Sequence, residues 1–372
     1  MKRVCVVTAT RSEYGLMRWF IDSIYHDEEL ELQLVVTGAH LSPDQGMTYK
    51  FIEEDGYPIS EKVPMLLSCN DEIGIVKSMG VCSISIVDTF NRLKPDVVVV
   101  LGDRYELIPI VSAALIMRIP VAHIGGGDIT EGAVDDEVRN AVTMMATLHF
   151  PGTKESAVNI KRMRGSEKYV FEVGEPGLDA FKREVTWSKE ETAKMLNLDL
   201  KLKWSLVTLH PETKLSLDEN VQMTNNLCNA LCHFKDCQFV ITYANADAGG
   251  GVINKIWADF VKLHPDNFQL YPSLGRERYL NYMKYVHFVI GNSSSGIIEA
   301  PLLGTPVVNI GDRQKGRHLC SNIVNCGRTN EEIINAIGKA MMNCKKVDNY
   351  WGDGESSSRI YAIIKDYLYG TK

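Results

Sequence analysis

Several features that mark other classes of protein are missing from this sequence of 372 residues. No stretch approaches the about 18 uninterrupted apolar residues of a membrane span, and the apolar run near the start ends at Arg11, too short for a signal-peptide core. The formal net charge of −7 gives no basic field for nucleic acid or an anionic membrane. We therefore expect a cytoplasmic protein that binds neither nucleic acid nor membrane.

Paired cysteines and two common nucleotide-binding motifs are missing as well. The nine cysteines are scattered without a C-x-x-C pair, which fits reduced thiols, and Cys228, Cys232 and Cys237 have the wrong spacing for zinc. The sequence has no G-x-x-x-x-G-K-[ST] loop and no G-x-G-x-x-G after its first apolar run. Nucleoside triphosphates and NAD are therefore disfavoured, and we expect neither a metal nor an organic cofactor.

What is present is an ordinary globular composition, with 45% hydrophobic and 23% charged residues. A chain of this length exceeds the size at which one hydrophobic core stops growing, so we expect two domains. In the first half, predicted strands at 4–7, 32–37, 97–101 and 120–123 alternate with predicted helices at 13–25, 73–93 and 107–117. Continuous apolar strands separated by helices predict a parallel sheet covered on both faces.

The alternation restarts after the turn-rich stretch 174–179. Strands are predicted there at 204–209, 238–242, 268–271, 287–290 and 306–310, and helices at 188–196, 217–232, 252–263, 276–285, 296–303 and about 357–368. The sequence thus predicts an α/β fold of two doubly wound, Rossmann-like domains, 1–176 and 177–356, facing across a cleft. The remaining residues, 357–372, form a terminal helix that is free to pack back on the first domain.

Charged residues leave the predicted strands of the first domain at their carboxyl ends, where ligands bind in open α/β sheets. Asp103 and Arg104 follow the strand 97–101, and we interpret both as lining the cleft floor. The competing interpretation of Asp103 is a helix N-cap. We favour a functional role for Asp103 over the N-cap interpretation, because its neighbours also have the side chains of a functional site.

A run of three glycines, 125–127, follows the strand 120–123. Consecutive glycines cost folding entropy and indicate that something approaches the backbone closely. Acidic residues then crowd into a short stretch, where a solvated helix start is the alternative interpretation. Asp135 and Arg139 are four residues apart and are predicted to pair on one helix face. The candidate catalytic residues of this stretch are Asp128, Glu131, Asp135 and Arg139.

In the second domain, His210 follows the strand 204–209 and precedes a proline that forces a turn, so it is a candidate for phosphate binding or acid–base work. We expect Asn245 to lie opposite it along the sheet. Ser293, Ser294 and Ser295 break a buried strand just before a helix, which is typical of an anion site. Glu299 follows within the first turn or so, and Arg313 supplies positive charge.

These residues occur in motifs that resemble a known family: VVTATRSEYG, VVLGDRYE, HIGGGDITEGAVDDEVRNAVTMMATLHF, VGEPGLD, VTLHPET and GNSSSGIIEAPLLGTPVVNIGDRQKGR. The chain resembles the hydrolysing UDP-N-acetylglucosamine 2-epimerases over nearly its whole length. The resemblance implies a GT-B fold, a UDP-sugar substrate and a homodimer, with catalytic carboxylates in the first domain and UDP held by the second. The implied reaction converts UDP-N-acetylglucosamine and water into N-acetylmannosamine and UDP, for sialic acid biosynthesis of a capsule or surface glycan.

The resemblance also assigns roles to residues. It implies that Arg11 reaches the diphosphate, that Ser293, Ser294, Glu299 and Arg313 hold phosphate and ribose, and that Asp103, Asp135, Arg139 and His210 are catalytic. One position departs from the pattern. Several relatives carry a carboxylate two residues after the histidine that matches His123, where this chain has Gly125. That role must fall to Asp128 or Glu131, so the choice of acid and base stays open.

Three alternatives fit the same motifs. The first is the same reaction on UDP-N,N'-diacetylbacillosamine, in the legionaminic acid route, because the residues that read a C4 substituent are not apparent from the sequence. The second is a non-hydrolysing 2-epimerase that retains UDP on the product. The third is a GT-B glycosyltransferase, which would need an acceptor site and would leave C2 untouched.

Overall fold

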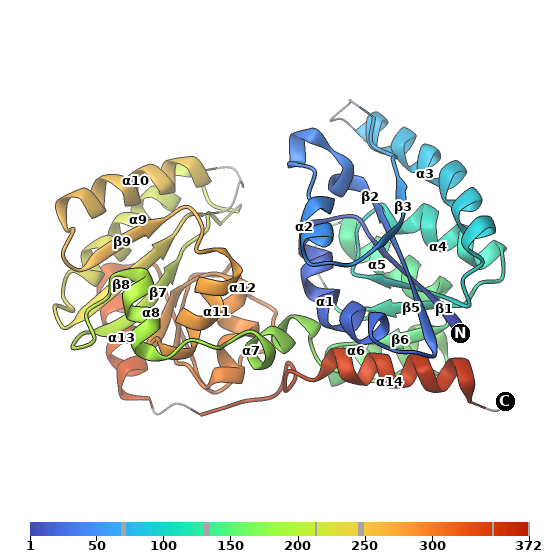
Figure 1. The fold of residues 1–372 in the computed structure, drawn as a ribbon. Helices are drawn as coiled ribbons and strands as arrows, with labels where there is room; N and C mark the ends of the chain where they lie inside the picture. Colours follow the sequence, from blue (N-terminus) through green and yellow to red (C-terminus); the bar gives the residue numbers. More distant parts are fainter. Residues whose placement is uncertain (68–71, 130–133, 213, 245–248, 344–345, 371–372) are drawn as a thin grey trace. The chain divides into compact units, whose positions relative to one another are not determined.

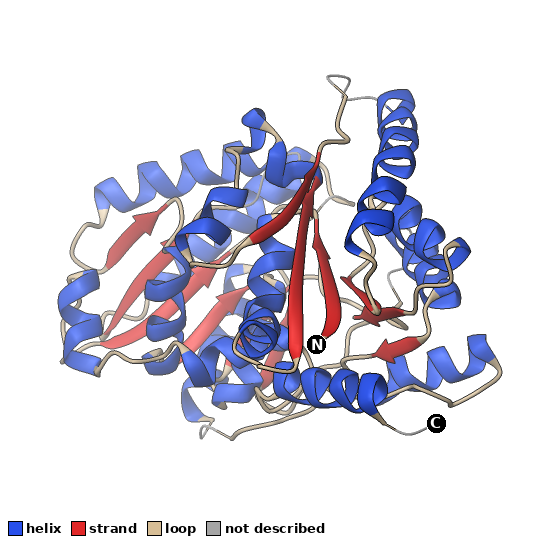
Figure 2. Cartoon of the chain, turned by 45° about the vertical axis from the view of Figure 1, so that its right-hand side comes forward, coloured by secondary structure: helices blue, strands red, loops and turns tan. Residues whose placement is uncertain are grey.

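Two parallel six-stranded sheets form the framework of the protein in a computed structural model (Figures 1 and 2). The structure describes residues 1–372 except 68–71, 130–133, 213, 245–248, 344–345 and 371–372. The chain divides into two compact units: unit 1 comprises Met1–Asp179 and Gly352–Lys372, and unit 2 comprises Ala180–Trp351. The predicted α/β fold with two parallel sheets is confirmed.

Unit 1 contains a sheet of strand order β3-β2-β1-β4-β5-β6, with every neighbouring pair parallel. Its strands are β1 (Lys2–Thr8), β2 (Leu30–Thr37), β3 (Ile59–Val63), β4 (Val97–Leu101), β5 (Val121–Ile124) and β6 (Leu148–Phe150). Its helices are α1 (Arg11–Tyr25), α2 (Tyr49–Glu54), α3 (Glu72–Leu93), α4 (Leu107–Ile116), α5 (Val134–Met145), α6 (Lys154–Arg164) and α14 (Ser356–Tyr369), with short 3-10 turns at Gly38–Leu41, Pro43–Gln45 and Pro176–Leu178.

Successive residues of the central strand β1 face two separate hydrophobic cores, as the alternation of side chains along a strand requires. Val4 and Val6 pack with α1 and with Ile360 of α14, whereas Cys5 and Val7 pack with residues of α3, α4 and α5. Helices therefore cover both faces of the sheet. The last helix, α14, lies against α1, and its first backbone N–H groups donate to the carboxylate of Asp179.

Unit 2 repeats this plan with the strand order β12-β11-β10-β7-β8-β9. Its strands are β7 (Lys203–Thr208), β8 (Cys237–Thr242), β9 (Phe268–Tyr271), β10 (Phe288–Gly291), β11 (Val307–Ile310) and β12 (Ile323–Cys326). Its helices are α8 (Lys189–Leu196), α9 (Leu217–Leu231), α10 (Gly250–Leu263), α11 (Gly275–Tyr285), α12 (Ser294–Ile298) and α13 (Asn330–Met342), with a 3-10 turn at Ala300–Leu303. The helix α7 (Asp179–Arg183) joins the two units along the chain.

The sequence prediction missed three of the four edge strands, the helices α2, α6 and α13, and one helix break. The strands β3, β6 and β12 are short or partly polar and lie at sheet edges, so they lack the apolar run of a central strand. The single helix predicted at 296–303 is wrong: α12 ends at Ile298 and a 3-10 turn follows. Pro301 explains the break, because it has no N–H to donate and disfavours helical backbone before it.

One described helix, α3, is long and apolar enough to cross a membrane when length and composition alone are considered. Its inner face explains part of that composition. Cys82, Ile86 and Phe90 are fully buried in the core beneath α3, together with residues of the sheet. The apolar residues on its outer face are not accounted for by this core.

Candidate active site

Both sheets reverse their strand order at a central point, which is where ligands bind in open α/β folds. In unit 1 the reversal lies between β1 and β4, and in unit 2 it lies between β7 and β10. The residues that follow these strands include Arg11, Asp103, His210 and Ser293. The topology therefore brings most of the residues singled out from the sequence to the carboxyl edge of one sheet or the other.

Asp103 follows β4 directly and does not cap a helix. The next helix, α4, begins at Leu107 with Glu106 as its N-cap residue. The carboxylate of Asp103 accepts hydrogen bonds from the guanidinium of Arg139, from Nε at 3.2 Å and from Nη2. The side chain of Asp103 is 31% exposed whereas that of Arg139 is 6% exposed, so the carboxylate forms the accessible part of the pair.

Arg139 connects three parts of the site from its buried position on α5. Besides Asp103, its Nη1 donates to the backbone carbonyl of Asp128 at 2.9 Å and to Asp136 at 3.2 Å. The sequence prediction that Arg139 pairs with Asp135 is wrong, because Asp135 is exposed in the first turn of α5 and the carboxylate three residues before Arg139 makes the ion pair instead. One guanidinium thus serves two carboxylates.

The glycine run is packed tightly, as the sequence predicts, but against the protein itself. A Cβ on Gly127, whose φ is 84°, would lie 2.2 Å from the backbone oxygen of Ser156 on α6. A Cβ on Gly126 would lie 2.8 Å from the hydroxyl of Thr143 and 3.0 Å from His123 Nδ1. Gly126 and Gly127 therefore let the turn pass between its neighbours and deliver Asp128 to the edge of the sheet.

Asp128 is held through its backbone and through its side chain. Its carbonyl accepts from Arg139, and its carboxylate accepts from the hydroxyl of Ser156. Glu131, the other candidate for the second carboxylate role, lies outside the described residues. Asp103, Asp128 and Arg139 therefore belong to one hydrogen-bonded group at the carboxyl edge of β4 and β5.

His123 on β5 supports this group without a charge of its own. The ring is fully buried, and burial lowers the pKa of His123 to about 4. Its Nε2 lies 2.8 Å from the carbonyl of Gly102, the residue before Asp103, and its Nδ1 lies 3.2 Å from the hydroxyl of Thr143. The neutral ring therefore ties the turn that carries Asp103 to α5.

Arg104 points to a different cluster from Asp103. Its guanidinium donates to the buried carboxylate of Glu106 at 2.6 Å and lies 3.8 Å from a carboxylate oxygen of Glu13. Glu13 is also buried, and it closes the capping box at the start of α1 by accepting from the backbone N–H of Ala9 at 2.7 Å. Burial raises the pKa of Glu13 to about 7, although that hydrogen bond and Arg104 oppose the shift.

Arg11 is the first residue of α1 and is exposed at the carboxyl edge of β1. Its guanidinium carbon lies 4.2 Å from the ring centroid of Phe51 on α2, within cation–π range. Arg11 thus offers a charge at the edge of the sheet that also carries Asp103.

In unit 2, Asn292 joins the ends of β7 and β10. Its side chain accepts from the backbone N–H of His210 at 2.7 Å and donates to the carbonyl of the same residue at 2.9 Å. Its own carbonyl accepts from Arg313 Nη1 at 3.1 Å and from Gln314 Nε2 at 2.9 Å. His210 and Arg313 are far apart in the sequence, but both are hydrogen-bonded to Asn292.

The three serines occupy the first turn after β10. Ser293 is the N-cap of α12, and its hydroxyl accepts from the backbone N–H of Ser295 at 3.4 Å. The Ser295 hydroxyl lies 3.0 Å from that of Ser293. Helix capping therefore explains the presence of Ser293 and also involves Ser295. Ser294 is the first residue of α12 and is half-exposed.

Glu299 is half-buried at the end of α12, and its carboxylate accepts from the hydroxyl of Tyr279 on α11. Burial raises the pKa of Glu299, while the Tyr279 hydrogen bond and the charge of Arg276 oppose the shift. Asn245, the remaining candidate of this unit, lies outside the described residues.

Sequence reasoning missed Asn292, Tyr279 and Glu212. Asn292 stands inside a quoted motif, directly before the serines, so its place at a strand end was the available signal. Glu212 is buried, and its carboxylate accepts from Arg328 Nη2 at 2.7 Å and from the backbone N–H of Asp312 at 3.2 Å. Tyr279 lies on a helix distant in sequence, and no local pattern marks it.

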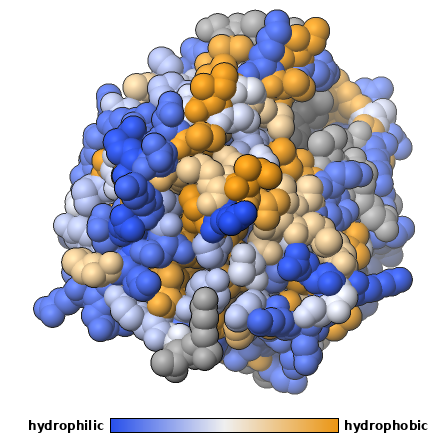
Figure 3. Space-filling view, turned by 90° about the vertical axis from the view of Figure 1, so that its right-hand side faces the viewer, coloured by the Kyte–Doolittle hydropathy of each residue, from blue (hydrophilic) through white to orange (hydrophobic). Residues whose placement is uncertain are grey.

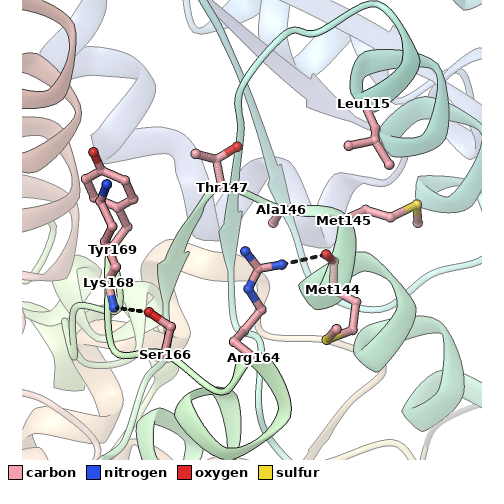
Figure 4. A pocket seen from close by; sticks show the side chains of 9 residues that line it. All are labelled: Leu115, Met144, Met145, Ala146, Thr147, Arg164, Ser166, Lys168 and Tyr169. Carbon is pink, nitrogen blue, oxygen red and sulfur yellow. Dashed lines mark hydrogen bonds between the residues drawn. The ribbon is translucent and has the colours of Figure 1, made fainter.

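Unit 1 contains a cavity of about 340 Å³ near the amino end of β6, away from the carboxyl ends of the strands (Figure 4). It is bordered by Thr147, directly before β6, and by Arg164, whose guanidinium donates to the carbonyl of Met144 at 2.7 Å. Because the candidate residues follow the carboxyl ends of the strands, this cavity does not belong to their site. Among the residues that the structure describes, no cluster of three or more His, Cys, Asp or Glu side chains could hold a metal ion.

Comparison with known structures agrees with the topology. A UDP-GlcNAc 2-epimerase from Neisseria meningitidis, solved with UDP-GlcNAc bound, superposes with a TM-score of 0.80 over 98% of this chain and 100% of that one, at 19% identity. Fold and strand-end residues together define an α/β protein of the GT-B-like class. The family model for UDP-N-acetylglucosamine 2-epimerase matches residues 22–365. The chain belongs to the UDP-N-acetylglucosamine 2-epimerase family.

Three relatives are similar to this chain over most of its length. A GDP/UDP-N,N'-diacetylbacillosamine 2-epimerase (hydrolyzing) of Campylobacter jejuni is 39% identical over 87% of this chain and 84% of its own length. A UDP-N,N'-diacetylbacillosamine 2-epimerase (hydrolyzing) of Legionella pneumophila is 31% identical over 98% and 96%. Polysialic acid biosynthesis protein P7 of Escherichia coli is 32% identical over 99% and 95%.

Proposed function

We propose that the protein is a hydrolysing 2-epimerase, which converts a nucleoside-diphosphate 2-acetamido sugar and water into the free 2-epimeric sugar and the nucleoside diphosphate. The observation that carries the proposal is the group formed by Asp103, Asp128 and Arg139 at the carboxyl edge of one sheet. The hydrolysing relatives support the same class of reaction.

The chemistry requires two stages. In the first, a base removes the C2 proton, the C1–O bond breaks, and the nucleoside diphosphate leaves with the bonding electrons, which gives a glycal. In the second, a proton returns to C2 from the opposite face and water adds at C1. No carbonyl acidifies the C2 proton, so C–O cleavage must lead, and stabilisation of the departing diphosphate is the largest demand on the protein.

Unit 1 supplies the proton-transfer groups in this proposal. Asp103 is the accessible carboxylate of the pair with Arg139, so it is placed to act as acid or base at C2. Asp128 or Glu131 acts as its counterpart. Arg139 and the neutral His123 position Asp103, since one holds its carboxylate and the other holds the turn before it.

Unit 2 supplies the nucleotide contacts. The backbone N–H groups and hydroxyls of Ser293, Ser294 and Ser295 meet the diphosphate together with the guanidinium of Arg313, and Glu299 accepts from the ribose hydroxyls. The shared anchor of His210 and Arg313 on Asn292 supports this assignment, because it fixes both to one end of the sheet. Arg11, Arg104, Asn245, Asp135 and His210 remain proposed contacts to the substrate.

The sugar is proposed to be 2,4-diacetamido-substituted, with UDP-N,N'-diacetylbacillosamine as the substrate. The relatives that are 39% and 31% identical over most of this chain carry that sugar in their names. UDP-N-acetylglucosamine, which the motifs first suggested for sialic acid biosynthesis, is the second candidate. The family description and the 32% identical polysialic acid biosynthesis protein favour it.

A direct comparison of the two sugars tests the substrate assignment. The enzyme is incubated with each UDP-sugar separately, and release of UDP is followed as a function of sugar concentration. We expect kcat/KM for UDP-N,N'-diacetylbacillosamine to exceed that for UDP-N-acetylglucosamine by at least tenfold. A larger kcat/KM for UDP-N-acetylglucosamine would reverse the assignment. The GDP-linked sugar is the third arm, because the Campylobacter relative carries both nucleotides in its name.

The resemblance implies a homodimer, the missing signal-peptide and membrane patterns of the sequence favour the cytoplasm, and we propose both. Gel filtration with light scattering checks the dimer, and fractionation of cells checks the location.

A further inference from the structure

The proposed reaction needs a second proton-transfer group besides Asp103. Because the configuration at C2 inverts, the proton leaves one face of the sugar and returns on the other, and a single carboxylate in a fixed position reaches only one face. Position 125, where the resemblance leads one to expect a carboxylate, is unsuited to it. Gly125 has a φ of 77°, in the left-handed region that residues with a side chain rarely adopt. The second carboxylate therefore comes from further along the turn after β5.

The helix α6 holds the end of this turn, which carries Asp128. The side-chain amide of Asn159 donates to the carbonyl of Gly127 at 2.9 Å, and Gly127 lies directly against the backbone of Ser156. The hydroxyl of Ser156 donates to Oδ1 of the Asp128 carboxylate. Arg139 on α5 donates to the backbone carbonyl of Asp128 at 2.9 Å. Two helices thus hold Asp128, α6 through its side chain and α5 through its backbone.

A second buried hydroxyl orients the first. Thr153 is the N-cap of α6, and its Oγ1 accepts from the backbone N–H of Ser156 at 3.2 Å and lies 2.7 Å from Ser156 Oγ. Both residues are only 3% exposed. Because an ionised carboxylate can only accept, Ser156 gives its single hydroxyl proton to Asp128, and Thr153 gives its own to Ser156. The two hydroxyls therefore form a directed chain that ends on Asp128.

Helix capping alone does not require this chain. An N-cap needs one side-chain oxygen, and Thr153 supplies it. Asp128 is only half-buried, and among the residues that the structure describes no hydrogen bond reaches its other carboxylate oxygen, Oδ2. One oxygen is thus held while the other is left for a ligand. Arg139 also joins Asp128 to Asp103, because Nη1 binds the carbonyl of the first and Nε binds the carboxylate of the second.

We infer that Asp128 is the second proton-transfer group and that Ser156, oriented by Thr153, positions its carboxylate. This inference rests on the proposed function and chooses Asp128 over Glu131. In the elimination, one carboxylate of the pair Asp103 and Asp128 takes the C2 proton while the C1–O bonding electrons leave with the nucleoside diphosphate. In the hydration, the other gives a proton to C2, water adds at C1, and the proton that this water loses returns to the same carboxylate. The first carboxylate then releases its proton to solvent.

Substitution of Asp128 and Ser156, singly and together, tests these roles. Asp128→Asn removes the proton acceptor and should lower kcat by about 10²–10⁴. Ser156→Ala removes one hydrogen bond to a charged group and should lower kcat by about 10- to 100-fold, while KM and UDP affinity stay within about twofold of wild type. The double variant should be no slower than Asp128→Asn, because Ser156 acts only through Asp128. A merely structural role of Ser156 would instead multiply the two losses.

Thr153 offers a conservative pair of variants. Thr153→Ser keeps the hydroxyl and the N-cap, and kcat should stay within about threefold of wild type. Thr153→Val keeps the shape without the hydroxyl and should lower kcat roughly tenfold, with KM unchanged. These two variants carry the same test if Ser156→Ala does not fold, and melting temperatures show which variants are folded.

The matched control is a serine on a helix that does not take part in this group. Ser112 on α4 is half-buried, and its hydroxyl donates to the carbonyl of Pro109 in its own helix at 3.2 Å. Figure 3 looks onto the side of unit 1 where α4 lies in Figure 1, and it shows a hydrophobic surface bordered by hydrophilic residues. Ser112→Ala removes a hydroxyl without touching a carboxylate, so kcat should stay within about twofold of wild type.

Wild-type turnover separates a failure of this inference from a failure of the proposed function. If the wild type releases UDP and a sugar inverted at C2, then normal kcat in Ser156→Ala, or multiplied losses in the double variant, would overturn the inference alone. A larger fall of kcat in Glu131→Gln than in Asp128→Asn would overturn the choice of Asp128. A C2-inverted product that keeps UDP would overturn only the proposed function, because inversion still needs two groups and the same variants test them. A wild type that leaves both UDP-sugars unchanged would overturn both.

Discussion

Asp103 and Arg139 form a pair in which the carboxylate is accessible and the guanidinium is buried. Arg139 also holds Asp136, so one positive charge faces two carboxylates. A carboxylate held in this way is oriented by the guanidinium and still open to a ligand. In the proposed reaction, Asp103 therefore carries the chemistry and Arg139 positions it.

Asp103→Asn tests that assignment, because it keeps the shape of the side chain and removes the proton acceptor. We expect kcat to fall by about 10²–10⁴, the usual contribution of a positioned acid or base. The affinity for UDP, measured by calorimetry, should stay near wild type because unit 2 is proposed to hold the nucleotide.

Asp136→Asn is the matched control. It removes a second carboxylate partner of Arg139, and we expect kcat to fall less than tenfold. Near-normal turnover of folded Asp103→Asn would instead give the catalytic role to Asp128 or Glu131. The melting temperature of each variant establishes that the folded protein is being assayed.

His149 gives a residue-scale prediction about stability and pH. Its ring is buried, and neither ring nitrogen has a hydrogen-bond partner among the described residues. Burial lowers the pKa of His149 from 6.5 to about 4. The unfolded chain therefore binds the proton first as the pH falls, and the folded state loses stability between about pH 6.5 and pH 4.

His149→Leu should remove this acid sensitivity. Relative to wild type, the free energy of unfolding of the variant should rise by about 2 kcal/mol between pH 7.5 and pH 5, whatever the packing cost common to both pH values. Urea unfolding at the two pH values measures the difference. If the substitution changed the free energy of unfolding equally at both pH values, protonation of His149 would not be the cause of the acid sensitivity.

The sequence predicted strand-end residues better than their partners. Asp103 and His210 follow long apolar runs, so their places at the sheet edge could be inferred. The partner of Arg139 on its own helix could not, because residues three and four positions away share a face and only packing selects Asp136 over Asp135. Tyr279 reaches Glu299 across 20 residues of sequence, which no local pattern encodes.

At the scale of elements, the turn after β5 depends on its glycines for packing. Gly127 adopts a φ of 84° directly against the backbone of Ser156 at the start of α6. We expect Gly127→Ala to lower the free energy of unfolding by about 3 kcal/mol or more, since both the backbone conformation and the contact oppose a side chain.

Gly165→Ala is the control for Gly127→Ala. Gly165 ends the same helix with a φ of 63°, and a Cβ added there would meet nothing within 4 Å, so only the backbone strain of about 1 kcal/mol applies. Urea unfolding of both variants separates the contact from the strain. Equal losses would contradict the packing role of Gly127.

The loop after β11 gives the element-scale test of the nucleotide site. Arg313→Ala should weaken UDP binding by about 1.5–3 kcal/mol, the cost of one charge-assisted contact, and Ser294→Ala should weaken it less because the backbone N–H groups remain. Lys315→Ala, an exposed cation two residues further on, is the control for net charge. Unchanged affinity in Arg313→Ala by calorimetry would place the nucleotide elsewhere.

Most central elements could be predicted from sequence because buried parallel strands are continuous apolar runs. The edge strand β3, Ile-Ser-Glu-Lys-Val, alternates polar and apolar residues at one side of its sheet, and β12 ends in Asn-Cys. Their pairing depends on the strands beside them, so local composition does not reveal it. Pro301 itself was a signal for the break after α12. The apolar residues on both sides of Pro301 nevertheless fit one continuous helix, and the prediction followed them.

At the scale of the whole molecule, the same strand order occurs twice, each time with polar residues at the reversal point. The proposal divides the reaction between these units, with proton transfer in unit 1 and diphosphate stabilisation in unit 2. Neither activity suffices alone, because elimination needs the C2 proton and the diphosphate to leave one substrate together.

Product analysis in D₂O shows whether the enzyme eliminates UDP and then hydrates the glycal. The enzyme is incubated with UDP-N,N'-diacetylbacillosamine, and in parallel with UDP-N-acetylglucosamine, and the sugar products are followed by NMR. We predict free UDP and a free sugar inverted at C2, with deuterium in place of the C2 proton. A product that still carries UDP, or a sugar released with its original C2 configuration and proton, would contradict it.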